Sequence, residues 1–154
     1  MGENTSQDQT IQFMLMEEEK KQNFGFEDIV IDYENGYAIM GGDNREWMAH
    51  YTLPSVDKHG QMYKFNFISE KFEIIPLINY HYDHFHPHGL SLLKNNNNKE
   101  QQLFVINHRT DDDNNDKIIE YVDIFDVQID ENTNKIQLKL VQSITDPLFT
   151  VHVL

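Results

Sequence analysis

Short runs of β-branched and aromatic residues, separated by turn-forming residues, recur along the chain from Phe24 onward. This pattern is typical of β-strands joined by tight turns, and no convincing amphipathic helix separates one run from the next. It therefore predicts an all-β domain with antiparallel strands rather than a parallel sheet with helical crossovers. The expected strands cover residues 28–33, 37–40, 61–68, 72–77, 89–93, 103–107, 118–127 and 135–144.

Turn-forming residues lie between the expected strands. The segment Glu34-Asn35-Gly36 predicts a tight hairpin, because Asn and Gly tolerate the positive φ angles of such turns, and residues 130–134 predict a second one. Two polar segments of low complexity, 95–98 and 111–116, separate apolar strands. Both are expected to be solvated loops.

Size and charge restrict the classes of partner. At 154 residues the chain has room for one domain, and its net charge of -14 disfavours nucleic acid and anionic membrane surfaces as partners. The absence of cysteine excludes disulfides and thiolate chemistry within this polypeptide. Residues 1–23 are polar and are expected to form a flexible tail with no signal peptide or membrane span, which predicts a cytoplasmic protein.

The most informative motif surrounds a group of histidines: His81, His84, His86 and His88 lie within one short segment. A zinc site is one interpretation, but Pro87 interrupts a regular strand and no carboxylate or cysteine completes a known ligand spacing. Solvent-facing or hydrogen-bonded histidines are the alternative. His88 precedes one apolar strand and His108 ends the next, so the two imidazoles are a candidate acid/base pair.

Two acidic segments are candidates for metal binding. Glu27 and Asp28 begin an apolar strand, where neighbouring side chains point to opposite faces and would serve two different sites. The alternative is that acids flank a strand start because that position is wet. Residues 111–116 fail the EF-hand pattern for calcium, since Asp116 replaces the turn glycine and Val122 the bidentate glutamate.

Taken in order, several segments of this chain resemble the paraoxonase/arylesterase family. They are Glu27-Asp28, Phe85-His86-Pro87-His88-Gly89-Leu90-Ser91, Leu103-Phe104-Val105-Ile106-Asn107-His108, Val122-Asp123-Ile124-Phe125-Asp126 and residues 138–144. The resemblance runs from about residue 24 to about residue 149. It implies a six-bladed β-propeller with calcium in its central tunnel and hydrolysis of lactones and aryl esters.

The resemblance also implies a role for individual residues. His88 resembles the histidine that helps to activate the attacking water, and His108 resembles its partner in a histidine dyad. Glu27 resembles a ligand of the catalytic calcium ion. Asp28 resembles a ligand of a second, structural calcium ion, to which the backbone carbonyl of Leu90 is a further expected ligand. No serine nucleophile motif occurs, so hydrolysis is expected to use an activated water.

The family pattern is covered only in part. Residues 24–154 correspond to about half of the propeller, and His152-Val153 replace an Asn-Asp pair that supplies calcium ligands in the family. The sequence therefore predicts a truncated propeller with open sheet edges, prone to self-association. Three hypotheses stay open: a calcium-dependent ester or lactone hydrolase, a non-catalytic β-module that assembles with itself or a second chain, and an inert gene remnant.

Overall fold

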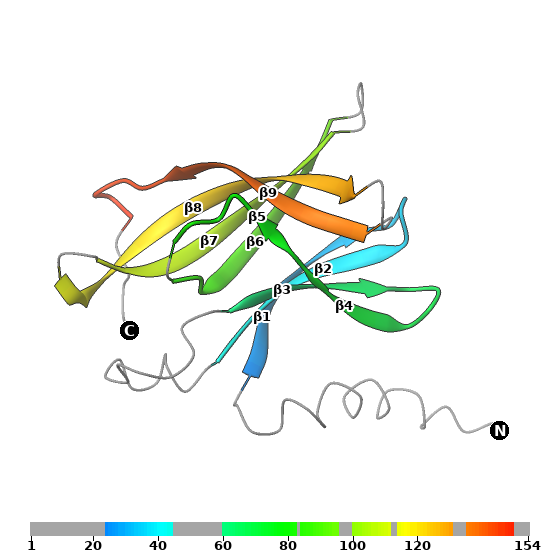
Figure 1. Ribbon diagram of the computed structural model, residues 1–154, viewed down its shortest axis with the longest axis horizontal. Coiled ribbons are helices and arrows are strands. Elements are labelled where there is room, and N and C mark those ends of the chain that lie inside the picture. Colours follow the sequence, from blue (N-terminus) through cyan, green and yellow to red (C-terminus); the bar gives the residue numbers. More distant parts are fainter. Residues whose placement is uncertain are drawn as a thin grey trace.

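The computed structural model describes residues 24–44, 60–82, 84–95, 100–111, 114–130 and 135–149. Within these ranges the chain forms strands and turns without any helix, which confirms the predicted all-β class (Figure 1). There is accordingly no helix among these residues that is suited to cross a membrane. The expected polar tail, residues 1–23, lies outside the described residues.

The first part of the chain forms a four-stranded antiparallel sheet in which neighbours in sequence are neighbours in space. Its strands are β1 (Phe24–Asp32), β2 (Tyr37–Asn44), β3 (Gln61–Asn66) and β4 (Lys71–Ile75). The predicted hairpin between β1 and β2 is confirmed, and Gly36 adopts a φ of 70° there. Asp32 fixes this turn by accepting hydrogen bonds from the backbone and side-chain nitrogens of Asn35 at 3.1 and 2.8 Å.

The second sheet has five strands in the order β5-β9-β8-β7-β6. They are β5 (Leu77–Ile78), β6 (Pro87–Lys94), β7 (Gln101–Asp111), β8 (Asn114–Asp130) and β9 (Lys135–Ile144). All neighbouring pairs are antiparallel except β5 with β9. The chain passes from the first sheet to the second at Pro76, whose carbonyl accepts a hydrogen bond from the amide of Leu138 at 2.9 Å.

The acidic segment 111–116 differs from its prediction. A solvated loop was expected there, whereas β7 continues to Asp111 and β8 begins at Asn114. The antiparallel pairing of Thr110 with Ile118 extends to Asp111 and Asn114 through a bulge. Backbone hydrogen bonding in a long hairpin therefore outweighs the low strand propensity of Asp and Asn, because each added pair satisfies polar backbone groups.

The two sheets pack face to face over one core (Figure 1). The first sheet contributes Tyr37, Ile39, Met62 and Ile75; the second contributes Leu103, Val105, Phe125, Ile136 and Leu138; and Phe85 comes from the segment between β5 and β6. In β7 and β9 the core residues alternate along the strand, as expected when one face of a sheet is buried. Each fully buried side chain of this size contributes about 1.5–3 kcal/mol.

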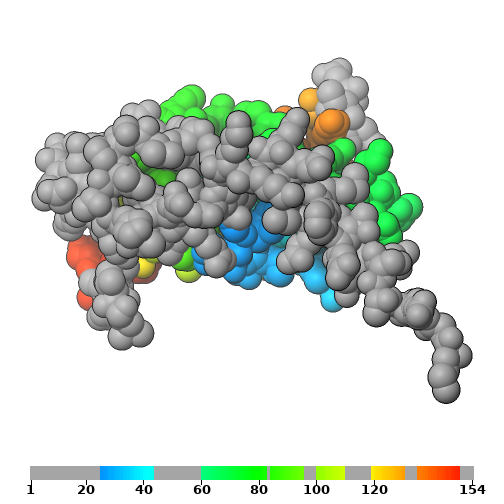
Figure 2. All heavy atoms as spheres, turned by 90° about the horizontal axis from the view of Figure 1, so that it is seen from below, coloured from blue at the N-terminus to red at the C-terminus, as the bar shows by residue number. Residues whose placement is uncertain are grey.

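Strands β1 and β6 lie next to each other at the edges of the two sheets. Contacts between them join Asp28 to Leu90 near their beginnings and Asp32 to Lys94 at their ends, so the strands run in the same direction. Atoms of the first strands, drawn in blue, form part of the surface near the centre of the molecule (Figure 2). This pair of strands carries a polar cluster at each end.

Candidate active site at the beginning of strands β1 and β6

The two histidines singled out by the sequence lie together. His88 is on β6 and His108 is on β7, and their ring centroids are 4.2 Å apart with an angle of 82° between the ring planes. An edge of one imidazole therefore faces the other ring. The two side chains are close enough to influence each other's protonation.

An irregular segment at the start of β6 makes this contact possible. The register between β6 and β7 shifts between Pro87 and Leu90, so His88 and Gly89 lie in a bulge. Gly89 packs closely against β7, and a β-carbon there would lie 3.0 Å from Cδ1 of Ile106. An added β-carbon would require the end of the Ile106 side chain to shift by a few tenths of an ångström, so Gly89 leaves that side chain in its place against the bulge.

A carboxylate lies near each of the paired imidazoles. Glu27 Oε2 is 3.8 Å from Nδ1 of His88, and Glu120 Oε1 is 3.8 Å from Nδ1 of His108. These distances are too long for hydrogen bonds, and Nδ1 of His108 is buried with no hydrogen-bond partner among the described residues. Nδ1 of His108 is therefore not fixed by a hydrogen bond from the described residues.

Burial controls the charge of His108. Removal of the imidazole from solvent is the main cause that lowers its pKa from 6.5 to about 4; the neighbouring His88 and His86 lower it further, and Asp43 opposes the shift. His108 is consequently uncharged at neutral pH. An uncharged imidazole has one ring nitrogen free to accept a proton or hydrogen bond.

A third histidine of the group identified in the sequence lies behind this pair. His86 is 1% exposed, and its Nδ1 lies 2.7 Å from Oδ2 of Asp43, which is also buried. Of the two states left open for these histidines, solvent-facing or hydrogen-bonded, His86 adopts the hydrogen-bonded one. Asp43 was missed because an acid late in β2 carries no local sign of a partner more than forty residues away.

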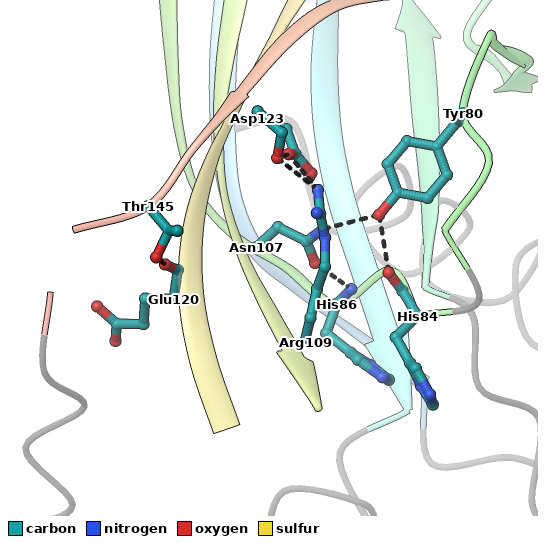
Figure 3. Close-up of polar contacts among 9 residues, drawn as sticks. Tyr80, His84, His86, Asn107, Arg109, Glu120, Asp123 and Thr145 are labelled. Atoms are coloured by element: carbon teal, nitrogen blue, oxygen red, sulfur yellow. Dashed lines mark hydrogen bonds and ion pairs between the residues drawn. The ribbon is translucent and has the colours of Figure 1, made fainter. Parts of the chain in front are cut away.

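Hydrogen bonds fix the backbone of His86 to β7. Its amide donates to Oδ1 of Asn107 at 2.7 Å, and its carbonyl accepts from the amide of His108 at 3.2 Å. Asn107 in turn donates to the hydroxyl of Tyr80 at 2.9 Å and to Asp123 at 2.7 Å. Figure 3 shows Asn107 at the centre of these contacts.

Arg109 completes this buried polar network. Its guanidinium pairs with Asp123 and donates to the hydroxyl of Ser143 at 2.9 Å (Figure 3). It also lies 3.7 Å from the ring centroid of Tyr82 and 4.2 Å from that of Tyr121. The network joins the segment before β6 to the middle of the second sheet, and so supports the position of His88 and His108.

Asp28 and Leu90 also lie together, but through a different group from the expected one. Oδ2 of Asp28 accepts a hydrogen bond from the amide nitrogen of Leu90 at 2.8 Å. The resemblance implied the carbonyl oxygen of Leu90 as a metal ligand. A register shift between Phe26 and Asp28 removes the simple alternation of β1, so both Glu27 and Asp28 contact β6.

Glu27 and Asp28 do not by themselves form a calcium site. Calcium takes about six to eight oxygen ligands at about 2.3–2.6 Å. Among the described residues no group of three or more His, Cys, Asp or Glu side chains is arranged to hold a metal ion. The two carboxylates alone do not fit a complete calcium shell.

Comparison of the sequence with models of known protein families, and with curated proteins, gave no match in either case. The chemistry of this site therefore depends on its own residues, which are two imidazoles in contact, a carboxylate near each, and a buried polar network behind them.

Proposed function

We propose that this chain is an ester hydrolase of the arylesterase or lactonase type, in which His88 and His108 activate a water molecule. The contact between the two imidazoles carries this proposal, because they come from different strands and lie beside partly exposed carboxylates. The lowered pKa of His108 supports it, since an uncharged His108 does not repel the positive charge that His88 gains when it accepts a proton.

The proposed reaction needs no protein nucleophile. His88 removes a proton from water as the water oxygen attacks the ester carbonyl, and the carbonyl electrons move to oxygen. The resulting intermediate collapses, the bond to the alkoxy or phenoxy group breaks, and that group takes the proton from His88. His108 remains uncharged and orients His88 through their ring contact. Phenyl esters suit this site best, because a phenol with a pKa of about 10 leaves more readily than an alcohol.

The same proposal interprets the two sheets as blades of a paraoxonase-like β-propeller. In support, β1 to β4 form an antiparallel sheet in chain order, β6 to β9 are antiparallel neighbours in chain order within the five-stranded sheet, and β1 and β6 lie side by side. Propeller blades have this arrangement around a central channel. Calcium enters the proposal as an ion to which Glu27 and Asp28 would contribute carboxylate oxygens.

Hydrolysis of phenyl acetate by the purified chain tests the proposed activity. We expect turnover that falls by about a hundredfold or more in His88→Gln, because general-base catalysis typically contributes that much. The exposed His81 provides the matched control, and His81→Gln should retain the activity. Equal activity of the two variants, or no turnover by the parent chain with calcium present, would exclude His88 as the base.

Calcium binding has its own test. An ion that binds only the folded chain raises the melting temperature with concentration. We expect such a rise in the parent chain and a smaller one in Glu27→Gln and Asp28→Asn. Absence of a calcium-dependent rise would remove the ion from the proposal without deciding whether the histidines catalyse hydrolysis.

A non-catalytic β-module that assembles with itself is the second candidate, and exposed apolar side chains favour it. Ile29 is 51% exposed on the edge strand β1, and Ile74 is 60% exposed on the other edge strand, β4. Such edges can pair with another chain. Sedimentation across a concentration series distinguishes the candidates: dimers without esterase activity favour assembly, whereas active monomers favour the hydrolase.

A further inference from the structure

A second polar cluster lies at the other end of β1 and β6, beside a cleft between the two sheets. The cleft has a volume of about 700 Å³, which is within the range of small-molecule sites. Lys94, at the end of β6, is one of its lining residues. Lys94 lies six residues after His88 along β6, and at about 3.3 Å per residue this corresponds to about 20 Å. The cleft is thus distinct from the candidate active site.

One wall of the cleft is built from polar side chains held in fixed positions. Asp32 is 0% exposed and accepts hydrogen bonds from Nζ of Lys94 at 2.5 Å and Nε2 of Gln101 at 2.6 Å. The hydroxyl of Tyr37 donates to Oε1 of Gln101 at 3.1 Å. A buried carboxylate therefore holds the ammonium and amide groups that line the cleft, so a ligand would meet a rigid polar wall.

Lys94 retains the capacity to bind an anion. Its second acidic neighbour, Glu34, is 3.5 Å away, and that glutamate side chain is 82% exposed. An exposed ion pair of this kind contributes little and is readily replaced. A second ammonium group, that of Lys64, also lines the cleft and is largely buried beside Glu73. The cleft lining thus contains two ammonium groups, each paired with a carboxylate, and two acidic side chains, Glu34 and Glu100.

The second sheet supplies an apolar wall to the same cleft. Val127 and Ile129 of β8 and Ile136 of β9 line it. An amphipathic molecule with a charged head and an apolar body matches these surfaces, since Lys94 would bind the head and these side chains the body. The net charge of -14 opposes anions only at short range, because salt screens charges beyond about 8 Å, and Lys94 must therefore exchange its exposed partner Glu34 to bind an anion.

We propose that this cleft binds a small monocarboxylate with an aliphatic or aromatic body, with its carboxylate on Lys94 and its body against Ile129 and Ile136. The carboxylate replaces the exposed Glu34 as the second partner of the ammonium group. This site does not depend on the hydrolase activity proposed above, because none of its residues contacts His88 or His108.

Calorimetric titration of the full chain with hexanoate, hexanol and hexylamine tests the chemical class of the ligand. We expect hexanoate to bind at least about tenfold more tightly than hexanol, because a charge-assisted hydrogen bond to an ammonium group is lost in the alcohol. Tighter binding of hexylamine would overturn the assignment of a carboxylate. Absence of hexanoate binding would overturn the site.

Two pairs of variants locate the binding. Ile129→Glu places a carboxylate in the apolar wall at an exposed position and should abolish hexanoate binding, whereas Val141→Glu, also exposed but outside the cleft, should not. Lys94→Gln should weaken binding by about tenfold or more. Lys139→Gln is its charge-matched control, because Lys139 follows the buried Leu138 and therefore points to the opposite face of the sheet.

Circular dichroism establishes that each variant is folded before titration. If Lys94→Gln unfolds because Asp32 loses its partner, the Ile129→Glu and Val141→Glu pair still decides the question. Equal binding by these two variants would place hexanoate elsewhere and overturn the proposal.

Discussion

The polar clusters at the two ends of the β1 and β6 pair differ in the hydrogen bonds that their titratable side chains make. At the end of the strands, Asp32 accepts four hydrogen bonds from three side chains and one backbone amide. At the beginning, Nδ1 of His88 and of His108 lie 3.8 Å from the carboxylates of Glu27 and Glu120, and Nδ1 of His108 has no hydrogen bond among the described residues. The first cluster is suited to stabilise the fold, and the second to exchange protons.

This difference indicates which of the two clusters contains side chains that can exchange protons. A fully hydrogen-bonded carboxylate has little tendency to change its protonation, and the pKa of Asp32 is accordingly lowered by its hydrogen bonds despite its burial. An imidazole with one ring nitrogen buried and not hydrogen-bonded is less constrained, and desolvation is the main cause that lowers the pKa of His108 to about 4. Three experiments test this difference between the two clusters.

The largest expected effect comes from removing Asp32. In Asp32→Ala the groups of Lys94 and Gln101 lose a buried partner, and we expect the free energy of unfolding to fall by about 3 kcal/mol. Urea denaturation measures it. Glu34→Ala is the matched control, because that exposed carboxylate contacts the same ammonium group and should change stability by less than about 1 kcal/mol. Similar losses in both variants would contradict the contrast between the two ends.

Two glycines, one near each end of the β1 and β6 pair, test how tightly that end is packed. A β-carbon at Gly60 would lie 2.5 Å from Cδ of Pro87, beside the histidine cluster, so Gly60→Ala should cost about 2–3 kcal/mol through overpacking. Gly36, in the turn after Asp32, has open space around it but a φ of 70°. Gly36→Ala should cost only about 1–2 kcal/mol. Thermal melts compare the two, and the reverse order would show that the β6 bulge tolerates displacement.

The smallest effect is a difference in acid sensitivity. Below pH 6.5 the unfolded chain protonates His108, whereas the folded chain resists this until about pH 4, so acidification lowers stability across that window. Asp32 has a lowered folded pKa, so its contribution is present above its usual value of 3.8 and is lost below it. His108→Gln should reduce the loss of stability between pH 6.5 and about pH 4, but not the loss below pH 3.8 that comes from Asp32. Urea denaturation at pH values on both sides of that window measures it.

Much of the local structure could be predicted from the sequence. The alternating apolar residues of 103–107 and 135–144 determine which face of each strand is buried, and Asn35-Gly36 determines the first hairpin, because both depend on neighbouring residues alone. The extent of the β7 and β8 hairpin was underestimated. Its acidic residues have low strand propensity, and only pairing with the opposite strand keeps them extended.

From the sequence alone it could be predicted that the chain is all-β and that His88 and His108 lie on consecutive strands. Only the tertiary structure decided that His86 binds Asp43, that Asn107 and Arg109 meet at Asp123, and that Asp32 holds Lys94 beside a cleft. These contacts join residues far apart in the chain. Which polar groups meet depends on how the two sheets pack, because a buried carboxylate is stable only where packing supplies its donors.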